Sequence, residues 1–89
     1  MVTCDESKRK ANLSRHGIDL AEMDTVFEGF LYTREDARMA YGEQRLQSLG
    51  WFRDRVVFLV WTDRQAGPHV ISCRYADKHE TRRYFQAIP

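Results

Sequence analysis

The sequence predicts a single α+β domain in which two helices precede a small antiparallel sheet and a third helix closes the chain. Three observations support this class. The 89 residues suffice for one core, apolar residues fall at helical spacing in the first third of the chain, and strand-like apolar runs follow from residue 44. The predicted order of elements is β-α-α-β-β-β-α. Residues 1–89 are expected to form one domain because no linker, repeat or low-complexity segment divides them.

The chain is expected to begin with a short strand at residues 1–4, followed by a helix through residues 8–16. Asp5 or Ser7 can act as the N-cap of this helix, because a short polar side chain can accept a hydrogen bond from the first turn. Gly17 is a typical residue for its C-terminal end.

A second helix is predicted from Asp19, as N-cap, to Gly29. Its apolar face is made by residues at helical spacing: Leu20, Met23 and Phe27. Residues 30–33 are a weak strand candidate, and the polar residues 34–42 are expected to form a loop.

Three strands of a meander are predicted over residues 44–51, 55–62 and 69–75. The middle strand is apolar on both faces and should therefore be central. Residues 63–68 are expected to form a loop, because Gly67-Pro68 is a strong turn signal. The last helix is predicted from residue 78 to about residue 87, with Asp77 as N-cap and Glu80 at the capping-box position.

A two-residue turn at Arg53-Asp54 would fix the pairing of the first two strands of the meander, because it places Glu43 opposite Arg64. Alternation then puts polar side chains of both strands on one face of the sheet: Glu43, Arg45, Gln47, Thr62 and Arg64. Arg74 is expected to share a face of the third strand with Val70 and Ser72. The longer loop before that strand leaves open which face this is.

The polar groups in these strands are the candidate site, because a guanidinium in a buried strand is costly unless a partner or an anion balances it. A carboxylate with several arginines suggests chemistry on a phosphate, whereas a salt-bridge network that braces the sheet explains the same residues equally well. A ribonuclease without a metal needs a base for the 2′-hydroxyl, donors for the phosphorus centre and an acid for the 5′-oxygen. Glu43 or His16 could be the base, arginines the donors, and a Tyr, His or Lys the acid.

The charge distribution limits the kinds of partner. The net charge of +1 argues against a bulk polyanion binder, although residues 19–43 carry −5 and residues 51–89 carry +3, so a basic patch on one side is possible. Eleven of the 14 basic residues are arginine, which favours bidentate phosphate contacts. Cys4 and Cys73 fit no metal spacing and are expected to be free thiols in a reducing compartment. We expect the protein to need no metal or other cofactor, to have no membrane span and to be cytoplasmic.

At these residues the chain resembles the BrnT family, the toxin half of a bacterial type II toxin–antitoxin pair. Short matching segments occur in order along nearly the whole chain: Asp5-Glu6-x-Lys8, Asn12-Leu13-x-Arg15-His16-Gly17-Ile18, Val26-Phe27, Gly42-Glu43-x-Arg45, Gly50, Val60-x-Thr62-x-Arg64, Val70-Ile71-Ser72-x-Arg74-x-Ala76, and Glu80, Arg83 and Tyr84. The sequence departs from the family pattern at three positions, Cys4, Leu20 and Cys73. These departures look like substitutions of one packing residue for another. Residues 30–41 match poorly.

The resemblance implies a RelE-like fold and a metal-independent endoribonuclease that cleaves RNA by 2′-hydroxyl attack, inhibits translation and arrests growth. It also implies a cognate BrnA-type antitoxin that neutralises the toxin and contacts operator DNA, so that DNA is reached only through the antitoxin. The catalytic residues that it implies are Glu43, Arg45, Arg64, Arg74 and His16. The RNA-binding candidates are Lys8, Lys10, Lys78 and Tyr84.

These candidate residues also have purely structural explanations. Lys8 and Lys10 also fit a solvated helix face, and His16 also suits a helix C-terminus electrostatically. The aromatic residues are expected in the core: Trp51, Phe52, Phe58, Trp61, Tyr84 and Phe85. The alternative function is a non-catalytic protein-binding module on the same fold, either gyrase-inhibitor-like or an operon co-repressor. The low net charge favours this alternative, and Glu43 with three arginines favours the enzyme.

Overall fold

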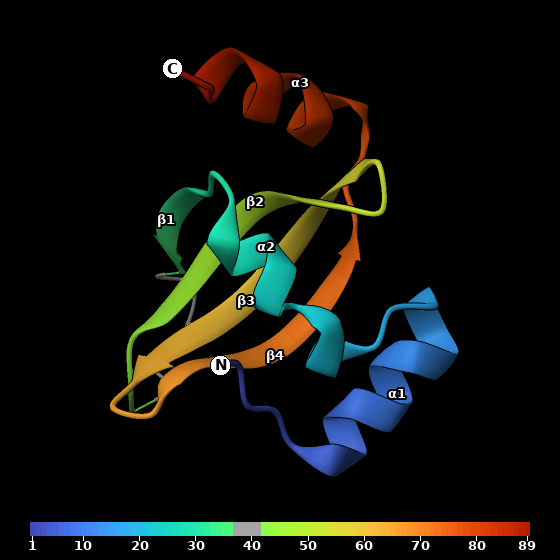
Figure 1. The fold of residues 1–89 in the computed structure, drawn as a ribbon, viewed down its shortest axis with the longest axis vertical. Coiled ribbons are helices and arrows are strands. Elements are labelled where there is room, and N and C mark those ends of the chain that lie inside the picture. The colour runs from blue at the N-terminus through green and yellow to red at the C-terminus, as the bar shows by residue number, and fades with distance from the viewer. Residues whose placement is uncertain (37–41) are drawn as a thin grey trace.

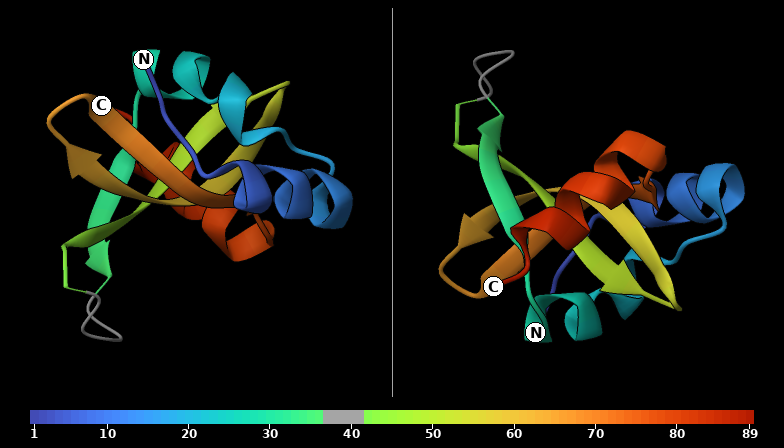
Figure 2. Two further views of the ribbon diagram at one scale, coloured as in Figure 1. Left: turned by 90° about the horizontal axis from the view of Figure 1, so that it is seen from below. Right: turned by 90° about the horizontal axis from the view of Figure 1, so that it is seen from above.

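The computed structural model describes residues 1–36 and 42–89 and shows an α+β fold (Figure 1). One antiparallel sheet has its strands in chain order, β1-β2-β3-β4. The sheet lies between α2 on one face and α3 on the other, as both views of Figure 2 show. The elements are α1 (Glu6–His16), η1 (Leu20–Glu22), α2 (Asp24–Glu28), β1 (Tyr32–Asp36), β2 (Arg45–Phe52), β3 (Arg55–Arg64), β4 (Gly67–Tyr75) and α3 (Lys78–Ala87).

The predicted fold class is confirmed, with two N-terminal helices, the meander and the C-terminal helix in the expected order. The strand predicted at residues 1–4 is only an isolated parallel bridge between Thr3 and His69. The fourth strand of the sheet is instead β1, which takes the last two residues of the weak strand candidate at 30–33 and the first three of the expected loop at 34–42. The rest of that loop, residues 37–41, lies outside the described residues. Four of the five side chains of β1 are exposed, so the segment has no alternating apolar pattern to reveal it.

The β2–β3 pairing follows the predicted register from Phe52 opposite Arg55 to Leu46 opposite Trp61. The two turn residues, Arg53 and Asp54, have φ of 49° and 61°, as a tight hairpin turn with left-handed backbone requires. Such a turn matches the right-handed twist of the strands, and for that reason a two-residue connection fixes the register.

The β3–β4 hairpin differs from the prediction in two ways. The expected loop at residues 63–68 is wrong, because β3 continues to Arg64 and β4 already begins at Gly67. A bulge also shifts the register, so that Val60 pairs with Ser72 but Trp61 pairs with Val70. Val70 therefore belongs to the opposite face from Ser72 and Arg74, and the prediction that all three share a face is wrong.

Two apolar clusters flank the sheet. The larger joins the sheet to η1, α2 and the residues that flank α1, Val2 and Ile18. The smaller packs under α3, where Leu49, Val56 and Tyr84 are buried. The prediction that the aromatic residues lie in the core is confirmed for Phe52 and Tyr84. Trp51 and Phe85 are instead 42% and 52% exposed, and their rings contact each other at the edge of the α3 interface.

Gly50 sets the distance between α2 and the sheet. A Cβ atom at this position would lie 2.5 Å from Cγ1 of Val26 and 2.9 Å from Cδ2 of Leu31. Both distances are too short for real contacts, so a larger residue would force α2 away from β2.

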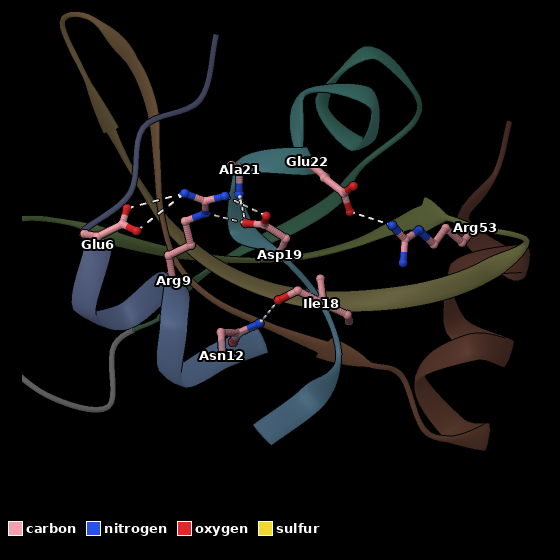
Figure 3. Close-up of polar contacts among 8 residues, drawn as sticks. All are labelled: Glu6, Arg9, Asn12, Ile18, Asp19, Ala21, Glu22 and Arg53. Atoms are coloured by element: carbon pink, nitrogen blue, oxygen red, sulfur yellow. Dashed lines mark hydrogen bonds and ion pairs between the residues drawn. The ribbon is translucent and has the colours of Figure 1, made fainter. Parts of the chain in front are cut away.

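Polar contacts tie α1 and η1 to their neighbours (Figure 3). Arg9 donates two hydrogen bonds to the carboxylate of Asp19, of 2.7 Å from Nε and 2.9 Å from Nη2. Glu22 of η1 accepts a 2.7 Å hydrogen bond from Arg53 in the β2–β3 turn. The N-cap Asp19 was predicted correctly, since its side chain also accepts from the backbone N–H of Ala21.

The Arg9–Asp19 pair makes stability sensitive to acid. The hydrogen bonds from Arg9, with that from Ala21, lower the pKa of Asp19 to about 2, whereas an unfolded Asp titrates at about 3.9. The stabilisation is essentially complete above about pH 5 and is lost progressively as the pH falls through about 2. Asp19→Asn should therefore flatten the decline of the urea unfolding midpoint over this range. Asp54→Asn, in the exposed turn, is the control for loss of one carboxyl. If the urea unfolding midpoint falls equally steeply with pH in Asp19→Asn and in the wild type, the prediction is contradicted.

Candidate functional site

The face of the sheet that carries α3 holds most of the predicted polar residues. Phe58 and Arg74 are paired across β3 and β4, and their side chains meet on this face. Residues at alternate positions of β2 and β3 continue the same face away from α3. The face of Arg74, which the sequence left open, is thus the same as that of Arg45, Gln47 and Thr62.

A carboxylate–guanidinium pair lies at the end of the sheet remote from α3. Oε1 of Glu43 accepts a 2.9 Å hydrogen bond from Nη2 of Arg64, so the predicted contact between these residues is confirmed. The side chains are 41% and 47% exposed, which leaves room for a ligand. The hydrogen bond from Arg64 lowers the pKa of Glu43 below its usual value despite partial burial, and Arg45 and His69 add to this effect. Glu43 is therefore ionised at neutral pH.

Neighbouring residues fix this end of the sheet. The hydroxyl of Thr62 donates a 2.7 Å hydrogen bond to the carbonyl of Gln44, which holds the segment before β2 against β3. Arg45 is half-buried and stands opposite Asp36 in the β1–β2 register.

His69 was missed by sequence reasoning. It is 6% exposed, stands opposite Thr62, and its Nδ1 lies 2.8 Å from the hydroxyl of Thr3. Its Nε2 lies 3.7 Å from a carboxylate oxygen of Asp5. The strand prediction began at His69, but without the true turn length nothing placed it opposite Thr62.

A second pair lies under α3. Arg74 donates two hydrogen bonds to Glu80, of 2.8 Å and 2.9 Å, and its guanidinium lies 4.4 Å from the centre of the Phe58 ring. Glu80 also accepts from the backbone N–H of Asp77, and this completes the predicted capping box. The hydrogen bonds from Arg74 lower the pKa of Glu80, while the partnership raises that of Arg74. Both groups therefore remain charged over the physiological range.

The two pairs do not form one cluster. Arg74 stacks on Phe58, and Arg64 is six residues further along β3, roughly 20 Å at the rise of a strand. Two carboxylates and three arginines thus make an elongated polar face, with the Glu43–Arg64 pair at one end and the Arg74–Glu80 pair at the other. A groove beside α3, lined in part by Arg34, Gln47 and Arg83, lies on this face.

The remaining predicted residues lie elsewhere. His16 is the last residue of α1, and within the described part of the chain no hydrogen bond or ion pair joins it to Glu43 or the arginines. Lys8, Lys10 and Lys78 are exposed, and Lys78 is the one on α3. Tyr84 is 4% exposed, its hydroxyl donates a 3.1 Å hydrogen bond to the carbonyl of Phe30, and burial raises its pKa. In this structure Tyr84 packs α3 on the sheet.

Neither cysteine is in a disulfide: Cys4 is half-buried and Cys73 is buried, where desolvation raises the pKa of its thiol to about 12. The described residues contain no cluster of three His, Cys, Asp or Glu side chains placed to hold a metal ion. Each helix in residues 1–36 and 42–89 is too short or too polar to span a bilayer.

A family model described as the ribonuclease toxin, BrnT, of type II toxin–antitoxin systems matches residues 4–80. The matched segment contains both charged pairs, from Glu43–Arg64 to Arg74–Glu80. No curated protein matches the chain.

Proposed function

Because this chain belongs to the BrnT family of ribonuclease toxins of type II toxin–antitoxin systems, we propose that it is a metal-independent endoribonuclease. In this proposal the 2′-hydroxyl of a nucleotide attacks the adjacent phosphate. The observation that carries it is the Glu43–Arg64 pair, an ionised carboxylate beside an exposed guanidinium at one end of an arginine-bearing face.

Each group has a task in such a cleavage. Glu43 accepts the proton of the 2′-hydroxyl, and Arg64 both keeps Glu43 ionised and offers its other N–H groups to the phosphate. Arg45 stabilises the charge that develops on the phosphate oxygens, for which one donor typically contributes about 2.7–4 kcal/mol. Arg74, roughly 20 Å from Arg64 along the sheet, contacts another phosphate of the same RNA strand. The 5′-oxygen leaves with a proton, and the products are a 2′,3′-cyclic phosphate and a 5′-hydroxyl. His16 is the candidate for the acid, and Lys78, on α3 and remote from Glu43, is a candidate for RNA binding.

The first test is cleavage of a defined RNA by the purified chain in EDTA, with analysis of the product ends. A 2′,3′-cyclic phosphate or a 3′-phosphate is expected. Failure of the folded chain to cleave RNA, both alone and with ribosomes, would reject the enzyme.

Membership of the family implies an antitoxin partner. Within the proposal, this partner is of the BrnA type and neutralises the toxin, and the complex contacts operator DNA through the antitoxin. Free toxin acts on RNA in the cytoplasm, inhibits translation and arrests growth.

The pH dependence of cleavage identifies the base. If Glu43 is the base, the rate of the wild type rises with pH through a pKa below the usual value for Glu and is level above it, because only the carboxylate accepts the proton. Glu43→Gln should lower the rate by about 10²- to 10⁴-fold and remove this acidic limb. Single-turnover rates from pH 3.5 to 8 measure both effects.

The matched control for this series is Glu28→Gln, at the exposed end of α2 on the other face of the sheet, which should keep the wild-type profile. An acidic limb that persists unchanged in Glu43→Gln would assign the base to another residue.

A non-catalytic protein-binding module, gyrase-inhibitor-like or an operon co-repressor, is the second candidate. The Arg74–Glu80 pair favours it, because two hydrogen bonds and a capping box are also what a network that braces α3 requires. Under this alternative, Glu43→Gln leaves binding of the protein target and repression unchanged.

A further inference from the structure

A groove lies between α3 and strands β1, β2 and β3, next to the Arg74–Glu80 pair. Its volume is about 380 Å³, counting the part that is open to solvent. The side chains that matter for its chemistry are Tyr32, Arg34, Gln47, Phe58, Glu80 and Arg83.

The floor of the groove holds a buried amide. Gln47 is 5% exposed, and its Oε1 accepts a 2.9 Å hydrogen bond from Nε of Arg34. Because an arginine can only donate, the atom of Gln47 that faces it must be the oxygen, and the amide NH₂ is left to face another group. A buried Gln is costly unless its polar atoms are used, so this orientation presents a donor to a ligand.

The walls carry aromatic rings and cations. Tyr32 is 47% exposed on the edge strand β1, and the half-buried ring of Phe58 lies deeper, against Arg74. Arg34 and Arg83 are both exposed and come from different elements, β1 and α3. Within the described residues, Arg34 makes its one hydrogen bond through Nε, and its two terminal nitrogens remain able to donate to an anion.

An exposed ring, an oriented amide and two guanidinium groups are the set that proteins use for single-stranded RNA. Rings stack on unpaired bases, amides read base edges, and guanidinium groups hold phosphates. We propose that this groove binds one unstacked nucleobase of an RNA strand, with Tyr32 stacking on the base, Gln47 donating to its edge, and Arg34 and Arg83 contacting the flanking phosphates. The inference rests on the proposed ribonuclease function.

The place of the groove on the sheet defines its role. Gln47 is four residues beyond Glu43, roughly 13 Å at the rise of a strand. The base in the groove therefore belongs to a nucleotide near the cleaved bond and not at it. Such a subsite selects the sequence around the cleavage position without taking part in the chemistry.

The experiment measures binding of the full chain to a 2′-O-methyl oligonucleotide, which cannot undergo 2′-hydroxyl attack. A series of such oligonucleotides, each with one abasic position, is compared by fluorescence anisotropy. Loss of the base at one position should weaken binding by about tenfold, the usual scale of one stacked base. Tyr32→Ala should weaken binding of the intact strand by a similar factor and should no longer respond to the abasic position.

Arg83→Ala should also weaken binding, whereas its neighbour Arg82→Ala is the matched control and should bind like the wild type. All three residues are exposed, and circular dichroism checks that each variant folds. If the wild type binds RNA but Tyr32→Ala and Arg83→Ala bind equally well, the groove proposal is overturned and the ribonuclease proposal stands. If the wild type neither binds nor cleaves RNA, both fail. If the substitutions weaken only the complex with the antitoxin, the groove is a protein-binding surface and the proposal is overturned.

Discussion

Arg74→Ala is expected to lower the rate of RNA cleavage at subsaturating RNA by about ten- to a hundredfold, the scale of one lost charge-assisted contact to a phosphate of the bound strand. The guanidinium is held over Phe58 by two hydrogen bonds to Glu80, so it is oriented before substrate arrives. No other cation can replace it without the same anchor. The rate of single-turnover cleavage of a defined RNA measures the effect.

The substitution also leaves the carboxylate of Glu80 without its main partner, so folding must be followed separately. We expect a cost of about 1–2 kcal/mol, near the low end for bonds to charged groups because Arg74 is 40% exposed. The double variant Arg74→Ala with Glu80→Gln removes the stranded charge and should recover stability but not activity. Binding of the antitoxin should survive in both. A folded Arg74→Ala variant that cleaves RNA at the wild-type rate would overturn the assignment.

Asn12→Ala is expected to have the largest effect on stability, about 3 kcal/mol. The side chain is 6% exposed, and its Nδ2 donates 2.9 Å hydrogen bonds to the carbonyls of Ile18 and Cys73. Its Oδ1 accepts a 3.0 Å hydrogen bond from the N–H of Cys73. Alanine would leave buried backbone groups unpaired, at about 1–3 kcal/mol for each group, against a total stability of about 5–15 kcal/mol.

The urea unfolding midpoint measures this loss, with Ser14→Ala on the exposed surface of α1 as the control. Since Asn12 binds the edge of β4 beside Arg74, the variant should also cleave RNA less well at temperatures where it begins to unfold. A stability within 0.5 kcal/mol of the wild type would show that Asn12 contributes little to holding α1 on the sheet.

The β2–β3 hairpin was predictable because a two-residue connection allows few registers. Arg53-Asp54 set the pairing, and the contact between Glu43 and Arg64 followed from it over ten residues on each side. The capping box of α3 was predictable for a similar reason, because both partners lie within one turn of the chain.

Features that depend on distant segments were not predictable. The bulge that turns Val70 away from Arg74, and the orientation of α3 that brings Glu80 to Arg74, arise from packing between elements. Asn12 looks like any polar residue of a surface helix, since its partner Cys73 is 61 residues away. The groove was missed because Arg34 was assigned to a loop, which left no strand opposite Gln47.

The N-terminal segment depends on residues that are made more than sixty residues later. Thr3 pairs with His69 and Asn12 with Cys73, across 66 and 61 residues of chain. A nascent chain on the ribosome therefore cannot dock its first helix until the fourth strand has emerged, and Arg74 has no anchor until Glu80 follows. Such long-range contacts slow folding. A product of interrupted translation that stops before residue 74 lacks both the docked helix and the second charged pair, so premature termination yields no complete site.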